Sequence, residues 1–435
     1  MKPSVKFIHT ADLHLGSRIQ LNKDFDSGRD EGYINAVYNS FNKIIKAAIE
    51  NEVNFLVISG DVFDNESRSV KATRYFKEKA EKLRKNGINI YLINGNHDPY
   101  RRKGELLELP ENVKICDTEE VSSFKVYEDD KLIARVLGQS YRGSSESRKM
   151  YGCYKAPDQS VYNIGLLHTQ LDPNNNNYVP VSKNNLLENA HIDYWALGHI
   201  HDNKVINEHL PYIIYPGIPQ GRDISETGPG GYYFVNLEPE NTYYSFKKTS
   251  DYIFERLEIN IGKLNKENLS ELIYFLKDEI DKFYSSLDKE VKGYILRIIL
   301  KGKSKLYDTF QGQEEEALED IISSLRSYYK DRMPSVFIND IVNRTAKIIK
   351  NIDEIIEKDP FIKELISFLN NLKNDEEKLK ELKEEMGDIW NPQVDLEKQE
   401  PKKFQITDQI FEEVFEQAKN EIIKEIIERR ISNEI

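Results

Sequence analysis

The chain has 435 residues, of which 31% are charged and 39% are hydrophobic. A chain of this length is too long for a single hydrophobic core, so we expect a globular protein of two or three domains. No apolar run approaches the roughly 18 residues that cross a bilayer, and the opening residues lack the pattern of a secretory leader. The two cysteines, Cys116 and Cys153, form no paired-cysteine motif, so we expect a reduced, cytoplasmic setting and no membrane partner.

The formal net charge of −13 is concentrated at one end of the chain. Residues 351–435 carry 23 acidic against 13 basic side chains, a net of −10, which leaves only −3 for the other 350 residues. This acidity argues against steering of nucleic acid by the whole surface. It does not exclude local capture of a phosphodiester, because two bound divalent cations would add positive charge where the phosphate sits.

The first hundred residues alternate between strand and helix patterns. Apolar runs typical of strands occupy residues 5–9, 54–59 and 88–93, and helical spacing of apolar residues occupies 32–51 and 69–86. This alternation predicts a parallel sheet with helices packed over it.

After residue 113 the helical pattern fades and short strands follow one another. They are expected at residues 124–127, 132–137, 161–167, 194–197, 212–215, 232–237 and 242–246. We expect these strands to build a second sheet that faces the first, because each sheet then buries the other. The predicted fold of residues 1–250 is therefore α/β, a four-layer α/β/β/α sandwich of two facing sheets.

Around residue 250 the pattern changes again. A strand pattern at 253–259, a helix near 266–283 and a strand pattern at 294–300 indicate a second, smaller unit. We expect a small α/β cap domain over residues 251–350.

Residues 351–435 are predicted to form charged helices, one of them over 362–386. A second helix, over 407–430, carries an apolar stripe at helical spacing, made of Ile410, Phe411, Val414, Phe415, Ala418, Ile422 and Ile426. The stripe has two interpretations. It either packs against its own domain or docks onto a partner protein.

Five of the eight histidines lie in short motifs rich in Asp and Asn. The motifs are Asp12-Leu13-His14, Gly60-Asp61, Gly95-Asn96-His97-Asp98, the isolated His168, and Gly198-His199-Ile200-His201. Each motif follows a predicted strand, and loops beyond the carboxyl ends of strands converge at one edge of an α/β structure. Taken singly, each also fits a tight turn or a structural histidine. Taken together, these side chains are the N and O ligands of a divalent transition metal site.

The order of these motifs resembles that of the calcineurin-like metallophosphoesterases. The opening Phe7-Ile8-His9-Thr10-Ala11-Asp12-Leu13-His14-Leu15-Gly16 is similar to the SbcD-type nuclease subunit of double-strand-break repair complexes. The segment Tyr215-Pro216-Gly217-Ile218-Pro219-Gln220-Gly221-Arg222 resembles the YhaO-like exonucleases. The resemblance covers roughly residues 1–250 and implies a metallophosphoesterase sandwich there.

The resemblance also implies roles for individual residues. Asp12, His14 and His201 would bind a first metal ion, and Asn96, His168 and His199 a second one. Asp61 would bridge both ions, since only a carboxylate offers two anionic oxygens to two cations. The implied cofactor is a pair of divalent ions, Mn²⁺ in particular.

His97 would then be catalytic, either as a general acid or as a stabiliser of the leaving oxygen, with Asp98 as a residue that orients it. Arg222 is a candidate contact for a substrate phosphate. Some relatives carry a histidine where Asp64 stands here. Asp64 is expected either to hydrogen-bond a ligand histidine or to cap the helix that follows it.

The predicted function is metal-dependent hydrolysis of DNA phosphodiesters, as a 3′-to-5′ exonuclease with single-strand endonuclease activity in double-strand-break repair. The alternative is a metallophosphoesterase for a small substrate, a phosphatase or a cyclic-nucleotide phosphodiesterase. Besides DNA, the resemblance implies an SbcC-like coiled-coil ATPase as partner. Homodimers are usual in the resembled family, although the sequence carries no dimer-specific signal.

Overall fold

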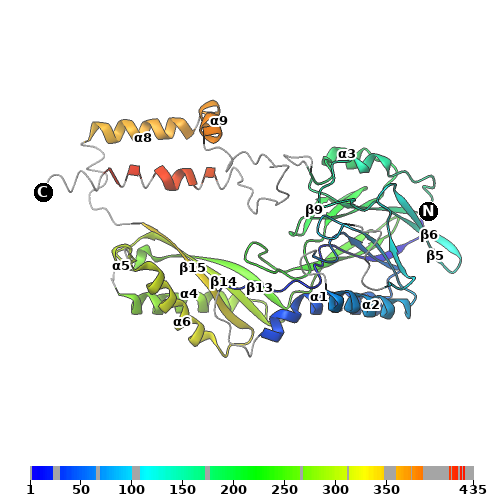
Figure 1. The fold of residues 1–435 in the computed structure, drawn as a ribbon, viewed down its shortest axis with the longest axis horizontal. Helices are drawn as coiled ribbons and strands as arrows, with labels where there is room; N and C mark the ends of the chain where they lie inside the picture. The colour runs from blue at the N-terminus through cyan, green and yellow to red at the C-terminus, as the bar shows by residue number, and fades with distance from the viewer. Residues whose placement is uncertain are drawn as a thin grey trace. The chain divides into compact units, whose positions relative to one another are not determined.

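The computed structural model describes residues 2–22, 30–64, 69–99, 108–171, 177–264, 268–310, 313–346, 359–373, 375–385 and, within 411–426, all except 413, 420, 421 and 424. The chain forms two compact units, Met1–Lys347 and Ile348–Ile435 (Figure 1). The first unit therefore includes both the expected sandwich and the expected cap. No helix among the described residues is long and apolar enough to cross a membrane.

The first sheet has six strands in the order β12-β11-β1-β2-β3-β4. Its parallel centre is formed by β1 (Val5–Thr10), β2 (Phe55–Ser59), β3 (Asn89–Ile93) and the short β4 (Val113–Ile115). Helices α1 (Asp30–Glu50) and α2 (Val70–Arg84) lie along one face of this sheet (Figure 1). Their apolar stripes form one core with the strands, as the contacts of Phe41, Phe76 and Leu56 show.

The second sheet has the order β5-β6-β7-β8-β10-β9. Its strands are β5 (Ser122–Glu128), β6 (Lys131–Gly138), β7 (Tyr162–His168), β8 (Tyr194–Gly198), β9 (Lys204–Asn207) and β10 (Tyr212–Tyr215). The two sheets face each other across a shared core, in which Phe7 and Phe55 of the first sheet pack with Ile164 and Tyr194 of the second. The 3-10 turn η1 (Met150–Cys153) and helix α3 (Lys183–Leu187) contribute residues such as Met150 and Leu186 to the core behind the second sheet. The four-layer α/β/β/α prediction is confirmed.

One detail of the strand assignment was wrong. The expected strands at 232–237 and 242–246 are β11 (Gly231–Leu237) and β12 (Tyr243–Lys248), and they join the first sheet rather than the second. β11 pairs antiparallel with β1, Val5 opposite Leu237. Without β11, β1 would be an edge strand with unpaired backbone groups. The period of a strand predicts its existence, but not the sheet that receives it.

The cap consists of a three-stranded parallel sheet, β13 (Tyr252–Asn260), β14 (Gly293–Lys303) and β15 (Ser335–Ala346). The 3-10 turn η2 (Ile261–Lys263) and helices α4 (Leu269–Ser286), α5 (Leu306–Phe310) and α6 (Glu314–Tyr329) connect its strands. Helices α4 and α6 lie on the same face of this sheet (Figure 1) and share its core.

A buried carboxylate joins the cap to the sandwich. Asp251 is 2% exposed and accepts hydrogen bonds from Asn39 and Lys43 of α1 and from Lys292, at 2.7, 2.9 and 2.7 Å. A small apolar cluster, which includes Tyr33 of α1 and Phe254 of β13, packs beside it. These contacts explain why residues 1–347 form one unit.

The second unit contains α8 (Pro360–Lys373), α9 (Glu376–Glu385) and helical residues between 411 and 426. The single helix expected over 362–386 is thus two helices, and Asp375 caps the second by accepting from the backbone N–H of Lys378. Lys373 of α8 pairs with Glu416 at 3.2 Å. Only part of the predicted apolar stripe is buried. Phe411 is buried, whereas Val414 and Ile422 are 44% and 45% exposed.

Candidate metal centre

The seven predicted ligands lie where strands of both sheets end. Asp12 and His14 follow β1, Asp61 follows β2 and Asn96 follows β3. His168 is the last residue of β7, and the segment with His199 and His201 follows β8. The structure brings all seven side chains together, because the two facing sheets present these strand ends on the same side.

Four of these residues have a left-handed backbone conformation. The φ angles of Asp12, His14, Asp61 and His199 are 52°, 44°, 53° and 96°. For residues other than glycine this conformation costs on the order of 1–3 kcal/mol each, and it persists only where surrounding contacts enforce it. Here the backbone N–H groups of Asp12 and His14 donate to the carbonyls of Gly60 and Asp61, both at 3.0 Å. The two loops therefore hold each other in the shape that turns their side chains inward.

The first half of the centre comprises Asp12, His14 and His201. One potential ligand atom of each lies within 4.8 Å of those of the other two. The two Nε2 atoms of His14 and His201 are 3.4 Å apart. The Nδ1 atom of His201 lies 2.7 Å from Oε1 of Glu226, so this carboxylate orients the ring with Nε2 toward the site. The Asp12 carboxylate accepts from the backbone N–H of His199 at 3.1 and 3.2 Å.

The second half comprises Asn96, His168 and His199. Oδ1 of Asn96 lies 2.9 Å from Nε2 of His168 and 3.1 Å from Nδ1 of His199. Nδ1 of His168 donates to the Ser59 carbonyl at 2.9 Å, which leaves Nε2 as the inward-facing atom. Gly60, with φ +100°, borders this ring so closely that an added Cβ would lie 2.2 Å from Nδ1 of His168.

Asp61 lies between the two halves. Its Oδ2 atom is 3.4 Å from Nε2 of His168 and 4.0 Å from Nε2 of His14. Its Oδ1 atom accepts from the backbone N–H of His97 at 2.9 Å. Burial opposes ionisation of Asp61, but His168 and the other histidines outweigh it and hold the pKa well below its usual range. A buried carboxylate between two sets of nitrogen donors fits a bridging ligand for two cations.

The protonation states of the histidines and of Asp12 also suit metal binding. Burial lowers the pKa of His14 well below its usual value and that of His199 to about 3, so both rings are neutral near pH 7, as metal ligands must be. Burial disfavours protonated His168 as well, but Asp61 outweighs it and raises the pKa to about 9. Burial raises the pKa of Asp12 to about 6. Bound cations would favour the deprotonated forms of both residues, so the donor set fits a pair of divalent ions.

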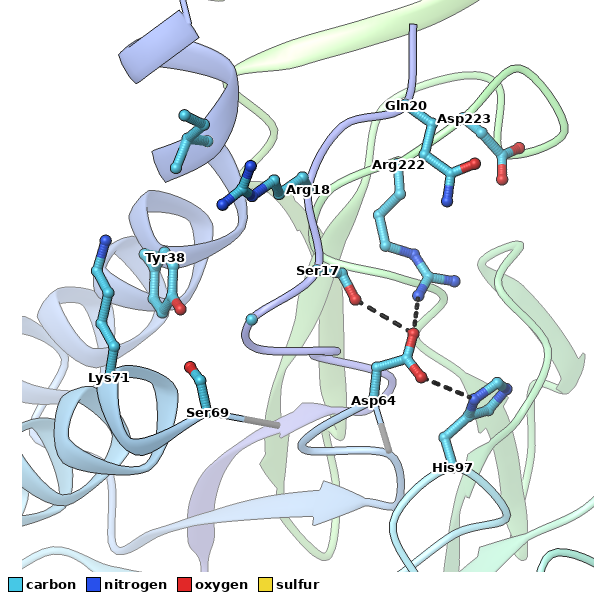
Figure 2. A pocket seen from close by; sticks show the side chains of 12 residues that line it. Ser17, Arg18, Gln20, Tyr38, Asp64, Ser69, Lys71, His97, Arg222 and Asp223 are labelled. Atoms are coloured by element: carbon cyan, nitrogen blue, oxygen red, sulfur yellow. Dashed lines mark hydrogen bonds and ion pairs between the residues drawn. The ribbon is translucent and has the colours of Figure 1, made fainter. Parts of the chain in front are cut away.

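His97 lies at the rim of the centre, and its ring centroid is 5.0 Å from that of His14. Its Nδ1 atom is 3.4 Å from Oδ1 of Asp64 (Figure 2). The hydrogen bond with Asp64 raises the pKa of His97, and the same bond lowers the pKa of Asp64 to about 2. The contact with Asp64 therefore occupies Nδ1 of His97 and favours the protonated form of the ring.

The predicted role of Asp98, orienting His97, is taken by Asp64. The buried Asp98 carboxylate instead accepts from the backbone N–H groups of Val62, Phe63 and Gly95, at 2.8, 3.2 and 2.9 Å. It ties the loop after β2 to the loop after β3. Neither alternative for Asp64 describes its observed contacts, since His97 is not a predicted ligand and Ser69 caps α2.

Arg222 contacts protein carboxylates from its loop. Its guanidinium lies 2.7 Å from Oε1 of Glu226 and 3.7 Å from Oδ2 of Asp64, and its side chain is 13% exposed. It thus links the carboxylate that holds His201 with the carboxylate that holds His97. Sequence reasoning missed Glu226, and the only available signal was an acidic residue in the loop that also carries Arg222.

A buried cluster of Asp, Asn and His at the strand ends of two facing sheets, with a further histidine at its rim, defines a metal-dependent phosphoesterase. Residues 5–203 match the family model of the calcineurin-like phosphoesterases. The chain belongs to this family.

Several relatives are similar to this chain in sequence over more than half of its length. A metallophosphoesterase named YhaO from Bacillus subtilis is 31% identical over 73% of this chain and 78% of its own. A DNA double-strand break repair protein Mre11 from Methanocaldococcus jannaschii is 33% identical over 61% of this chain and 72% of its own. An Mre11 from Methanococcus maripaludis is 24% identical over 80% of this chain and 96% of its own.

Proposed function

We infer that this metallophosphoesterase is a DNA phosphodiesterase, a 3′-to-5′ exonuclease with single-strand endonuclease activity that acts in double-strand-break repair. The observation that carries this proposal is the extent of the similarity to the DNA repair proteins. It reaches 80% of this chain, whereas the phosphoesterase family model covers only residues 5–203. The similarity to the repair protein therefore extends beyond the segment that the family model matches, into the part of the chain that contains the cap.

The residues at the site have distinct tasks in this reaction. Asp12, His14 and His201 would hold one cation, Asn96, His168 and His199 the other, and Asp61 both. When bound, the cations lower the pKa of water and offset the charge that develops on the phosphate. Mixed imidazole and carboxylate ligation suits Mn²⁺, which we propose as the metal.

His97 supplies the proton that the leaving oxygen requires. The oxygen of water forms a new bond to phosphorus, the ester P–O bond breaks, and His97 transfers its proton to the departing oxygen while the proton of water passes to solvent. Asp64 keeps the His97 ring protonated and oriented, because the pair is 3.4 Å apart. Such proton transfer contributes about 10²–10⁴ to a rate.

Cleavage of end-labelled DNA in the presence of Mn²⁺ tests the proposal, with phosphomonoesters as competing substrates. We expect shortening of linear DNA from its 3′ ends. The His97→Ala variant should retain bound metal but lose about 10²–10⁴ in cleavage rate. A clear preference for phosphomonoesters would contradict the proposal, and equal activity of the variant would remove His97 from the mechanism.

We also propose that an SbcC-like coiled-coil ATPase binds the second unit. Its exposed apolar side chains, Phe361, Phe368, Val414 and Ile422, would supply the contact. Co-elution with such an ATPase should be lost when Val414 and Ile422 are replaced by Asp. Retained co-elution would place the contact elsewhere.

A further inference from the structure

A cavity of about 610 Å³ opens beside the metal centre. It lies between the segment that follows β1, helix α1 and the start of α2, and Asp64 and His97 form one end of it (Figure 2). Its other polar walls include Ser17, Arg18, Tyr38, Ser69 and Lys71. None of these five residues belongs to the predicted metal site.

Two cations of this cavity have no carboxylate partner among the residues that the structure describes. Arg18 and Lys71 are both exposed, and Lys71 lies over the ring of Tyr38, 5.4 Å from its centroid. The third cation, Arg222, is neutralised by Glu226 at 2.7 Å. Arg18 and Lys71 therefore present two positive charges to the cavity with which no carboxylate of the described residues is paired.

The acidic groups of the cavity contact residues other than Arg18 and Lys71. Asp64 contacts His97, and Asp223 accepts from the backbone N–H of Ser225 at 2.7 Å. Figure 2 shows Arg18 and Lys71 on the side of α1 and α2, away from Asp223. Lys71 also lies in the first turn of α2, where the helix dipole adds to the preference for an anion. This side of the cavity suits phosphate groups.

A second hollow lies along α1 and borders two of the same residues. That hollow, of about 490 Å³, shares Tyr38 and Lys71 with the first and extends past Asn35 and Asn39 to Lys292. Because both hollows border Tyr38 and Lys71, they offer a strand that extends from His97 a path along α1, away from the metal centre. One small leaving alcohol would not require such a path, whereas a chain of several phosphodiesters would.

His97 decides which part of the substrate enters this path. In the proposed mechanism the group that protonates the leaving oxygen stands next to it, and His97 forms one wall of the cavity. The leaving side of the substrate must therefore extend into the cavity. Hydrolysis leaves this product with a hydroxyl group and the other product with the phosphate.

We propose that the cavity is the binding site of the leaving nucleic-acid strand, with Arg18 and Lys71 binding the phosphates beyond the scissile one. The inference rests on the proposed nuclease function and deepens it, since it assigns the discrimination between polynucleotides and small phosphoesters to two residues. Each bound phosphate displaces counterions. On a single strand, each such contact contributes about 0.7 to the slope of log affinity against log salt concentration.

The test compares two substrates and two double variants. The substrates are a short end-labelled single strand of DNA and bis(p-nitrophenyl) phosphate, both with Mn²⁺. The variants are Arg18→Ala/Lys71→Ala and, with the same change of charge, Lys82→Ala/Lys85→Ala at the exposed far end of α2. Thermal unfolding midpoints establish that both variants fold as the wild type does.

We expect kcat/KM of Arg18→Ala/Lys71→Ala on DNA to fall at least about tenfold, and at least about fivefold more than on the small diester. Its plot of log kcat/KM on DNA against log salt should flatten by about 1.4. The control variant should match the wild type on both substrates.

Other outcomes separate the two ideas. Wild-type protein that hydrolyses the small diester but not DNA would refute the proposed function and, with it, the assignment of the cavity. Wild-type protein that cleaves DNA, together with an Arg18→Ala/Lys71→Ala variant that loses nothing or loses both activities equally, would refute the assignment of the cavity alone.

Discussion

The two halves of the metal centre each contain a histidine that is oriented by a different kind of group. In the first half, His201 is oriented by the side chain of Glu226, which Arg222 contacts in turn. In the second half, His168 is oriented by the backbone carbonyl of Ser59, beside Gly60. Side-chain support can be altered without changing the backbone, whereas backbone support cannot. The orientation of His201 is thus adjustable by substitution, whereas that of His168 is fixed by the course of the chain.

The largest effect is expected for Asp61→Asn, which belongs to both halves. Loss of the shared anionic carboxylate should weaken both metal sites and remove several kcal/mol of transition-state stabilisation, a factor of about 10³ or more in rate. Activity assays together with metal analysis check this. Retention of both ions with near-normal activity would show that Asp61 is no bridge and would make the comparison of halves meaningless.

The second half of the centre should be disrupted by a substitution that changes its backbone. Gly60→Ala places a Cβ 2.2 Å from Nδ1 of His168 at a φ of +100°, so the ring must leave the position in which its Nε2 lies 2.9 Å from Oδ1 of Asn96. We expect loss of one metal ion and a fall in activity of about 100-fold, because misplacement by about 1 Å costs this much. Gly87→Ala is the matched control, since Gly87 also has positive φ (+72°) but nothing near its Cβ. If both variants lost the same activity, the loss would come from the strain of a side chain at positive φ and not from the clash with His168.

The first half should respond to Glu226→Gln. The amide keeps the size of the side chain but loses the charge that holds His201, which typically costs about 10–100-fold in metal affinity. Titration calorimetry should show one weakened and one unchanged site. Weakening of both sites would indicate that the halves are coupled and not independent.

The smallest effect is expected for Asp64→Asn, and it concerns pH. Asp64 raises the pKa of His97, so its loss lowers that pKa and deprotonates the acid at lower pH. The alkaline limb of kcat should therefore move to lower pH, with metal affinity unchanged. A kcat profile that does not move would show that His97 is not the group that titrates.

The sequence predicts which side chains meet at the strand ends, because each depends on a local pattern. An apolar strand followed by Asp, Asn or His locates the side chain at a sheet edge without knowledge of the partner strand. Glu226 lies outside any such pattern, in a Gly- and Pro-rich loop 25 positions after His201. The contact of Asp64 with His97 likewise depends on two loops meeting in space, so the local options considered for Asp64 were both wrong.

The fold, like the site, is predictable where it depends on local sequence patterns and not where it depends on contacts between distant segments. Apolar periodicity locates α1, α2 and the strands of both sheets, but β11 and β12 join the first sheet through pairing with β1, which periodicity does not encode. The break between α8 and α9 depends on a cap at Asp375, a local signal that the strong Lys and Glu content of the segment obscures. The docking role of the second unit remains a prediction.

The left-handed conformation of Asp12, His14, Asp61 and His199 limits how this centre could be transplanted. A designer who copied the seven donor side chains onto the ends of ordinary strands would start from negative φ angles and aim the donors elsewhere. Only a graft that includes both loops would reproduce the site. It would need their backbone hydrogen bonds and the contacts of the Asp98 carboxylate with the backbone N–H groups of both loops.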